Sequence, residues 1–379
     1  MSARRSVLRL AVAAATAASL AALVACEDTA KPTELEPLKP SIAGRQVWKH
    51  GFSGFPGSQA VAVAPGGTEF VVGASNGDIV ALDAQTGHEN WRADAGAKLA
   101  SGVGTDGRFT AAVNRDGELV VIEKGKARWK QHLNTAVVTA PFVAGERVFV
   151  LGVDRSVQAY DVLNGSLIWT FARSGGDALT LSQGGVLSSY KDTLLVGQGN
   201  RLTALDPTKG LVRWEAVVAT PRGTNEVERL ADLVGPVSRV GATYCMRAFQ
   251  NGVGCVDADR ATTTWTLPGS GSQAVAADDD MVFSADGIDR ITARRRASGE
   301  TVWSSDKFQN RRLSAPVSVG KTVVFGDYKG WVHFLSRDTG AQLLRLETDG
   351  SQVVGQPARI GNTILVTTKD GNAFAFRPE

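Results

Sequence analysis

The sequence predicts an all-β protein, an eight-bladed β-propeller made of four-stranded antiparallel blades. The main observation is an internal repeat, because seven of the eight tryptophans end a recurring phrase whose clearest copy is Ala81-Leu82-Asp83-Ala84-Gln85-Thr86-Gly87-His88-Glu89-Asn90-Trp91. Copies end at positions 48, 91, 129, 169, 214, 265, 303 and 344, the last with Leu in place of Trp. Their spacings of 38 to 51 residues suit one blade each. Eight Asn-Gly or Asp-Gly pairs favour the tight hairpin turns between strands.

The residues of the phrase have structural roles. We expect the Asp and Thr side chains to bond the turn backbone, the Gly to take the left-handed conformation, and the Trp to pack against the next blade. The chain ends in an inner-strand sequence, 373–376, with no Trp strand after it, while the strand around Trp48 has no blade of its own. Pairing of these two segments would complete the eighth blade and leave no open edge.

Three segments are predicted along the chain: a signal peptide over 1–25, a lipidated tether over 26–43 and the propeller over 44–379. The first nine residues carry three arginines, and Leu10–Leu23 is an uncharged, apolar run. As a helix, this run would rise about 21 Å, short of the ~30 Å hydrocarbon core of a bilayer. It is therefore typical of a signal peptide rather than of a permanent membrane span.

The signal ends in Leu23-Val24-Ala25-Cys26, which resembles a bacterial lipobox. We expect the Cys26 thiol to take diacylglycerol; the alternative is an ordinary secretory signal with a chance Cys. Several acyl chains hold a protein on a membrane because each buried CH₂ contributes ~0.8 kcal/mol. Cys26 is followed by Glu27, not by the Asp that marks inner-membrane retention in many bacteria, so we expect attachment to the outer membrane, facing the periplasm. The polar segment 27–41 would form the tether.

Charge and motifs exclude several function classes. The formal net charge is +3, from 41 Lys and Arg against 38 Asp and Glu. The first 25 residues hold three Arg and no acid, so the remainder is neutral and offers no broad electrostatic surface for nucleic acid. Four His and three Cys are too few for a cluster-type metal site. The stretch 102–107 matches G-x-G-x-x-G, but strands flank it on both sides, so its glycines are interpreted as turn residues. No catalytic residue, metal or cofactor is predicted.

Two cysteines predict a structural disulfide. Cys245 and Cys255 lie on either side of a hairpin at Gln250-Asn251-Gly252. Paired strands would bring them face to face, and a disulfide needs Cβ atoms ~3.8 Å apart. An oxidising envelope compartment favours the bridge; the alternative is two buried free thiols.

The repeated phrase resembles the blades of quinoprotein alcohol dehydrogenases, which bind pyrroloquinoline quinone with a calcium ion and a catalytic Asp. A quinone- and calcium-dependent periplasmic dehydrogenase is therefore the alternative function. The sequence lacks the vicinal Cys-Cys pair of those enzymes, a recognisable acid-rich ligand set and their much greater length.

Residues 222–232, Arg-Gly-Thr-Asn-Glu-Val-Glu-Arg-Leu-Ala-Asp, are followed by Pro236-Val237. This stretch is similar to a signature of the BamB family, the lipoprotein subunits of the outer-membrane β-barrel assembly machinery, and the resemblance covers the whole chain. It implies a non-catalytic scaffold without a cofactor. It further implies binding to the periplasmic POTRA domains of the insertase BamA, which folds and inserts β-barrel proteins. Direct contact with unfolded client proteins, by adding a strand to a blade edge, stays open.

Two adjacent long connections, after Trp169 and Trp214, predict the partner surface, because binding residues concentrate on loops held by a rigid scaffold. The family resemblance implies these partner-binding residues: Leu179, Leu181, Ser182 and Asp232. Ser182 replaces the family's Arg, and only the first acid of the family's Asp-x-Asp is kept. Two further residues are expected to brace the second loop: Glu226 and Arg229. The alternative for the two leucines is that they cover the propeller face.

We expect the substitution Cys26→Ser to abolish incorporation of labelled fatty acid, because lipid transfer needs the thiol. The protein should stay unprocessed by the lipoprotein peptidase or be released as soluble protein. Cys255→Ser serves as the control and should keep the label. Label entering the Cys26→Ser protein would show that the lipidation site is wrong.

Overall fold

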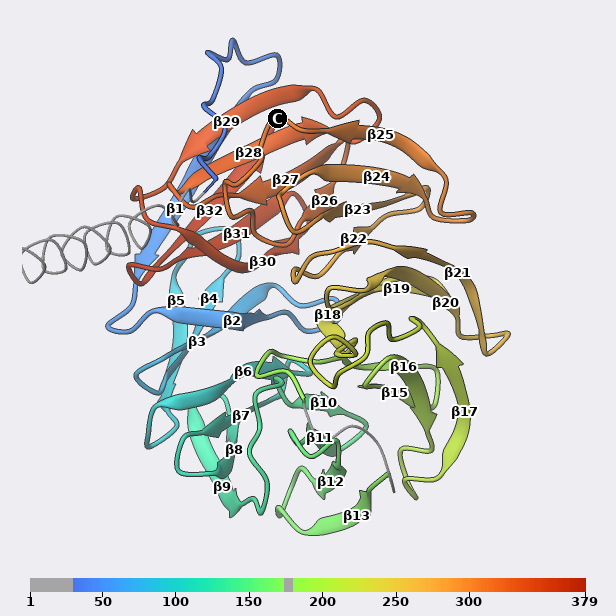
Figure 1. Cartoon of the computed structure of the whole chain (residues 1–379). Coiled ribbons are helices and arrows are strands. Elements are labelled where there is room, and N and C mark those ends of the chain that lie inside the picture. The colour runs from blue at the N-terminus through green and yellow to red at the C-terminus, as the bar shows by residue number, and fades with distance from the viewer. Residues whose placement is uncertain (1–29, 174–179) are drawn as a thin grey trace, which may run out of the picture.

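The computed structural model describes residues 30–173 and 180–379, and every regular element in these ranges is a β-strand. The strands form eight four-stranded antiparallel sheets, arranged as blades around a ring (Figure 1). The predicted eight-bladed propeller is therefore confirmed. Within the described ranges no helix is long and apolar enough to cross a bilayer.

Blades one to seven follow each other along the chain, innermost strand first. Blades one and two comprise β2 (Pro56–Ala62), β3 (Glu69–Ala74), β4 (Asp78–Asp83), β5 (Glu89–Asp94), β6 (Leu99–Thr105), β7 (Phe109–Asn114), β8 (Glu118–Glu123) and β9 (Lys126–His132). Blades three and four comprise β10 (Phe142–Ala144), β11 (Arg147–Leu151), β12 (Val157–Asp161), β13 (Leu167–Phe171), β14 (Leu187–Tyr190), β15 (Thr193–Gln198), β16 (Arg201–Leu205) and β17 (Val212–Val217).

Blades five and six comprise β18 (Leu233–Val240), β19 (Thr243–Ala248), β20 (Gly252–Asp257), β21 (Thr262–Pro268), β22 (Ala276–Ala277), β23 (Met281–Ala285), β24 (Ile291–Arg295) and β25 (Thr301–Ser305). Blade seven comprises β26 (Val317–Val319), β27 (Thr322–Gly326), β28 (Trp331–Ser336) and β29 (Gln342–Glu347). Blade eight comprises β30 (Val353–Ile360), β31 (Thr363–Thr368), β32 (Asn372–Pro378) and β1 (Gly44–Gly51).

Blade eight closes the ring as the sequence predicts. Strand β1 pairs antiparallel with β32, and Trp48 lies opposite Ala375. The Glu379 backbone N–H donates to the Ala43 carbonyl at 2.9 Å, so a hydrogen bond joins the end of β32 to the start of β1, where other blades have a covalent turn. Closure gives the eighth sheet its fourth strand, so all eight blades have four strands.

The recurring phrase joins neighbouring blades through its Trp and Gly. Trp48 Nε1 donates to the Ala84 carbonyl at 3.1 Å, and the Trp48 ring covers Gly87, where an added Cβ would lie 2.5 Å from a ring atom. Gly87 has a φ of 72°, and Asp83 Oδ1 accepts the Thr86 backbone N–H at 2.8 Å. The same ring-on-glycine contact recurs at these pairs: Trp129–Gly165, Trp169–Gly210, Trp265–Gly299 and Trp303–Gly340. The expected roles of the phrase residues are confirmed.

The phrase also explains two of the junctions that lack the ring-on-glycine contact. At the closure, Gly44 stands four residues before Trp48, which is the spacing between glycine and tryptophan in the phrase. A Cβ on Gly44 would lie 2.5 Å from Leu344. Leu344 therefore fills the Trp position of blade seven against a glycine supplied by the other end of the chain. In blade five, Ala261 takes the glycine position with a φ of 56°.

Each blade is apolar in the middle and polar at its outer edge. Strand β8 has four consecutive buried residues, because neighbouring blades cover both of its faces. The outermost strand β9 of the same blade has six exposed residues out of seven. The innermost and outermost strands run in opposite directions, so the connections from one blade to the next all emerge on one face. We call it the loop face; the hairpins between second and third strands lie on it too.

Residues 30–43, the described part of the predicted tether, lie against the propeller. The Thr33 backbone N–H donates to the Gln309 carbonyl at 2.9 Å, and the Ser41 backbone N–H donates to the Leu343 carbonyl at 2.9 Å. Leu35 packs against a buried apolar cluster of blades six and seven. Figure 1 shows this segment beside β29. Backbone hydrogen bonds and a few apolar side chains therefore hold the described part of the segment against the propeller.

We expect Gly87→Ala to lower the free energy of unfolding by about 2–5 kcal/mol. The added Cβ would clash with the Trp48 ring, and alanine is also disfavoured in the left-handed backbone conformation of this position. Gly361→Ala is the matched control, because Gly361 also has a positive φ, 58°, but no atom lies within 4 Å of its added Cβ. The control should lose only about 1–2 kcal/mol. Equal losses in urea unfolding would contradict a role for the ring contact.

Candidate functional site

The two long connections predicted to bind a partner meet in a cleft on the loop face. They join blade three to blade four and blade four to blade five. The cleft has a volume of about 40 Å³ and is lined by residues including Leu181, Gln183, Arg155 and Asp232. Small-molecule sites usually have about 300–1,000 Å³, so this cleft has room for a side chain and not for a quinone cofactor.

Asp232 holds the cleft together from inside. Its Oδ2 accepts the Leu181 backbone N–H at 2.9 Å, and its Oδ1 accepts Arg155 Nη2 at 3.2 Å. The Arg155 carbonyl in turn accepts Gln198 Nε2 at 2.7 Å. One carboxylate therefore ties a hairpin of blade three to both long connections. Its two oxygens are engaged within the chain and its side chain is only 14% exposed. Its role in partner binding stays a prediction.

The first connection is described from Thr180 onward, and Leu179 lies outside the described residues. Leu181 is partly buried in the cleft, whereas Ser182 is exposed beside a neighbouring groove of about 180 Å³. Gln183 Nε2 donates to the Ser272 carbonyl at 2.8 Å, in the connection between blades five and six. This part of the loop therefore crosses the loop face and is held at several points.

The second connection forms a compact turn over residues 222–230. Asn225 Oδ1 accepts the Glu228 backbone N–H at 2.9 Å, and the Glu228 carboxylate accepts the Thr224 backbone N–H at 2.8 Å. The hydrogen bond from Thr224 holds the pKa of Glu228 below its usual value. Asn225 and Glu228 were not singled out from the sequence, although an Asn three residues before an acid favours such a turn. Glu226 is exposed and Arg229 is partly buried, and their bracing role stays a prediction.

Val227 lies in the same turn and is 67% exposed, the most exposed of the large apolar side chains in the described ranges. The polar bonds of its neighbours fix the turn, so this side chain is presented to solvent on a rigid support. Its exposure could not be read from the sequence, because an apolar residue between two acids is equally compatible with burial.

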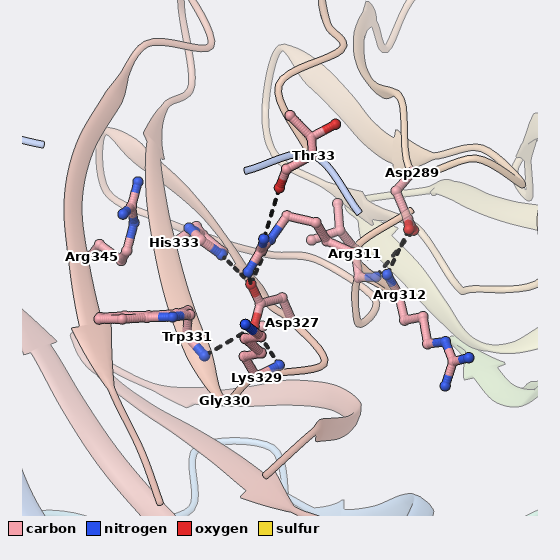
Figure 2. A network of polar contacts seen from close by, with 12 residues as sticks. Thr33, Asp289, Arg311, Arg312, Asp327, Lys329, Gly330, Trp331, His333 and Arg345 are labelled. Carbon is pink, nitrogen blue, oxygen red and sulfur yellow. Dashed lines mark hydrogen bonds and ion pairs between the residues drawn. The ribbon is translucent and has the colours of Figure 1, made fainter. Parts of the chain in front are cut away.

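A buried polar network lies on the loop face of blade seven (Figure 2). The Asp327 Oδ2 atom accepts Arg311 Nη2 at 2.6 Å and contacts His333 Nε2 at 3.0 Å. Its Oδ1 accepts the backbone N–H groups of Lys329 and Trp331. Burial lowers the pKa of His333, so Arg311 supplies the positive charge opposite the carboxylate. Both oxygens are occupied and shielded from solvent, so the network braces two loops and presents no reactive group.

The predicted disulfide partners lie directly opposite each other on β19 and β20. Their sulfur atoms are 1.94 Å apart, and both residues are fully buried. The bridge joins two central strands of one blade. Its oxidation in the cell stays a prediction.

A family profile described as outer membrane protein assembly factor BamB matches residues 40–98, 75–305 and 290–379. This chain belongs to the BamB family. An outer membrane protein assembly factor BamB from Burkholderia pseudomallei is 36% identical over 376 residues, 98% of each chain. The match over 75–305 includes both long connections.

Solved structures show the same fold. The crystal structure of BamB from Moraxella catarrhalis has a TM-score of 0.78 at 21% identity, covering 88% of this chain and all of that chain. A europium-containing methanol dehydrogenase has a TM-score of 0.68 at 15% identity, covering 88% of this chain and 93% of that one. At these identities the likeness concerns architecture, so the propeller does not by itself separate the BamB family from dehydrogenases.

We expect Asp232→Asn to loosen both connections, because it removes the ion pair with Arg155 and weakens the acceptor for Leu181. A loss of about 1–3 kcal/mol is expected for such a partly buried charged bond. The rate of backbone amide hydrogen exchange over the segment 180–186 measures this loosening, and the rate should increase in the variant. Glu226→Gln, in the same connection but exposed, should leave that exchange unchanged; equal effects would show that Asp232 does not brace the cleft.

Proposed function

We propose that this protein is a non-catalytic scaffold lipoprotein of the outer-membrane protein assembly machinery. Membership of the BamB family supports the role of an assembly factor at the outer membrane. In our proposal Cys26 carries the lipid and the propeller faces the periplasm. The propeller binds the POTRA domains of the insertase BamA and assists folding and insertion of β-barrel proteins.

The observation that carries the proposal is the Asp232 brace between two long connections on one face. Binding costs less when the binding loops are already held in one conformation, because less conformational freedom is lost. The brace holds Leu181 at the cleft, and Asn225 and Glu228 hold Val227 in a rigid turn. An apolar contact at each of two fixed points suits docking of a folded domain.

A quinone-dependent dehydrogenase is the second candidate, because the fold is shared with a methanol dehydrogenase. The residues present do not fit the quinone and its calcium ion. Among the described residues, no group of three or more His, Cys, Asp or Glu side chains could hold a metal ion. The cleft at Asp232 has a volume of about 40 Å³, and its one acid is bonded to Arg155.

We expect Leu181→Asp combined with Val227→Asp to reduce capture of the insertase at least about tenfold, since each change places a charge at an apolar contact. Affinity capture of the tagged lipoprotein from solubilised envelopes measures it. Leu211→Asp is the control, because Leu211 is 63% exposed on the outer rim, at a strand turn opposite the loop face.

Full capture by the double variant, with unchanged thermal unfolding, would place the docking site elsewhere.

Addition of pyrroloquinoline quinone and calcium to the purified protein tests the second candidate. Dye reduction with alcohols would contradict the non-catalytic proposal.

A further inference from the structure

The contact between a tryptophan and the next blade is incomplete at the junction of blades one and two. At five other junctions the ring lies on a glycine, and its Nε1 donates to a carbonyl of the same turn. The accepting carbonyls are those of Ala84, Val162, Pro207, Arg296 and Arg337. No described residue accepts Trp91 Nε1. A Cβ built on Gly125 would meet backbone atoms of Arg92 and the Cβ of Trp91 first, so this glycine lies beside the strand rather than on the ring.

A short turn in blade two accounts for the difference. In blade one, six residues lie between the paired positions Leu82 and Glu89. Six residues also lie between the corresponding positions in blades three to seven. In blade two only four residues lie between Ile122 and Ala127. The turn that would cover the Trp91 ring is therefore two residues shorter than its counterparts.

The junction of blades four and five differs from this one. No described residue accepts Trp214 Nε1 either, but the blade-five turn opposite it has the usual six residues. Ala261 takes the glycine position in that turn, whereas blade two keeps the glycine and loses length. Among blades one to seven, the shortened turn is therefore particular to blade two.

A pocket of about 450 Å³ lies at this junction. Trp91 lines it from blade one, Arg108 lines it from blade two, and Lys124 of the short turn also lines it. The remaining walls come from the hairpins between the first and second strands of both blades, so the pocket lies on the face opposite the loop face. Its volume is within the range of about 300–1,000 Å³ that is usual for ligand sites.

Polar side chains in the walls are paired within the chain. Asn90 Nδ2 donates to Glu69 Oε1, and Arg108 Nε donates to Glu123 Oε1 at 2.8 Å. These pairs leave no strong demand for a ligand of one charge. A partly buried tryptophan N–H usually finds an acceptor, and Trp91 has none among the described residues. The pocket therefore offers chiefly an aromatic ring and one hydrogen-bond donor.

The complete junctions show which group fits a tryptophan in this position. At Trp48 the covering turn supplies the backbone of Gly87, with a φ of 72°, and the Ala84 carbonyl, 3.1 Å from Nε1. The turn is closed by the Gly87 backbone N–H, which donates to the Asp83 carbonyl at 2.8 Å. One peptide turn therefore provides both the glycine for the ring and the acceptor for the indole N–H.

We propose that the pocket between blades one and two binds a glycine-containing turn of a partner protein. The glycine lies on the Trp91 ring, and a carbonyl of the turn accepts Nε1, so the partner supplies what blade two lacks. The corresponding turns of a second copy of this chain are packed on that copy's own tryptophans at five junctions, so the turn comes from a different protein. The pocket and the Asp232 cleft lie on opposite faces, and this inference is independent of the proposed function.

A cyclic peptide with the sequence of residues 82–89 is the probe, because Leu82 and Glu89 already pair across the turn in blade one. NMR of the full chain labelled with ¹⁵N in its tryptophans measures the indole N–H signals. We expect the Trp91 signal, assigned with Trp91→Phe, to shift and to saturate as the peptide is added. The Trp129 signal should stay unchanged, because that ring is covered and its Nε1 is bonded.

The matched control is the same peptide with the change Gly87→Ala. At the complete junction a Cβ on Gly87 would lie 2.5 Å from an atom of the Trp48 ring, so the alanine peptide should bind at least about tenfold more weakly. Equal binding of the two peptides would overturn the proposal. So would an unchanged Trp91 signal with the glycine peptide in large excess.

A further variant fills the pocket from within the chain. Residues 123–126 are replaced by the six residues of the blade-one turn, 83–88. The Trp91 signal should then move without any peptide, and added peptide should cause no further shift. Unchanged peptide affinity in this variant would overturn the proposal. The comparison of the two peptides uses the unmodified chain, so it decides the question even if the variant fails to fold.

Discussion

The contact between a tryptophan ring and a glycine of the next blade is the constraint on which the rest of the structure depends. Each blade buries both faces of its middle strands against its neighbours, so the ring is stable only if successive blades meet at a constant distance and angle. The Trp ring sets this distance because it lies directly on the glycine backbone, and its Nε1 bonds a carbonyl of the same turn, as Trp48 does with Ala84. A side chain on Gly87 would move the whole blade outward.

A ring held in this way is a rigid support for the segments that cross its loop face. The connections around Leu181 and Val227 need few contacts of their own, because their ends are already fixed by the strands. Asp232 supplies the contact between connections, and Asn225 and Glu228 supply the local turn. These polar groups are used inside the chain, and they hold the exposed Val227 and the partly buried Leu181 in fixed positions.

The buried network of blade seven likewise holds the N-terminal segment, residues 30–43, in place. Asp327 lies wholly inside the protein with every oxygen bonded, which offsets the cost of burying its charge. Arg311 is thereby held with one nitrogen directed at Thr33 (Figure 2). Two places on the loop face are therefore held by the same kind of contact, a carboxylate paired with an arginine. At the cleft the pair is Asp232 and Arg155. Beside the N-terminal segment 30–43 it is Asp327 and Arg311.

The sequence by itself determined the architecture, because the repeat is local. The four-residue spacing from Gly87 to Trp91 recurs in the other blades, with Ala261 and Leu344 as the two substitutions within it. Hairpins between adjacent strands place Cys245 opposite Cys255 without reference to the rest of the chain. The ring closure could be predicted from the same repeat, because the strand at Trp48 belongs to no complete copy of the repeat near it in the chain. The long connections that form the cleft were also visible, as excess spacing between tryptophans.

Only the tertiary structure decided what individual polar residues do. Arg155 lies 77 residues before Asp232 in the chain, and only the folded ring shows that it engages one oxygen of the Asp232 carboxylate. Arg311 and Thr33 are 278 residues apart, so no local pattern could show that the expected tether is docked. Such bonds depend on which side chains the closed ring brings within about 3 Å of each other. Periodicity sets the positions of the strands, but it carries no information about which side chains meet across blades.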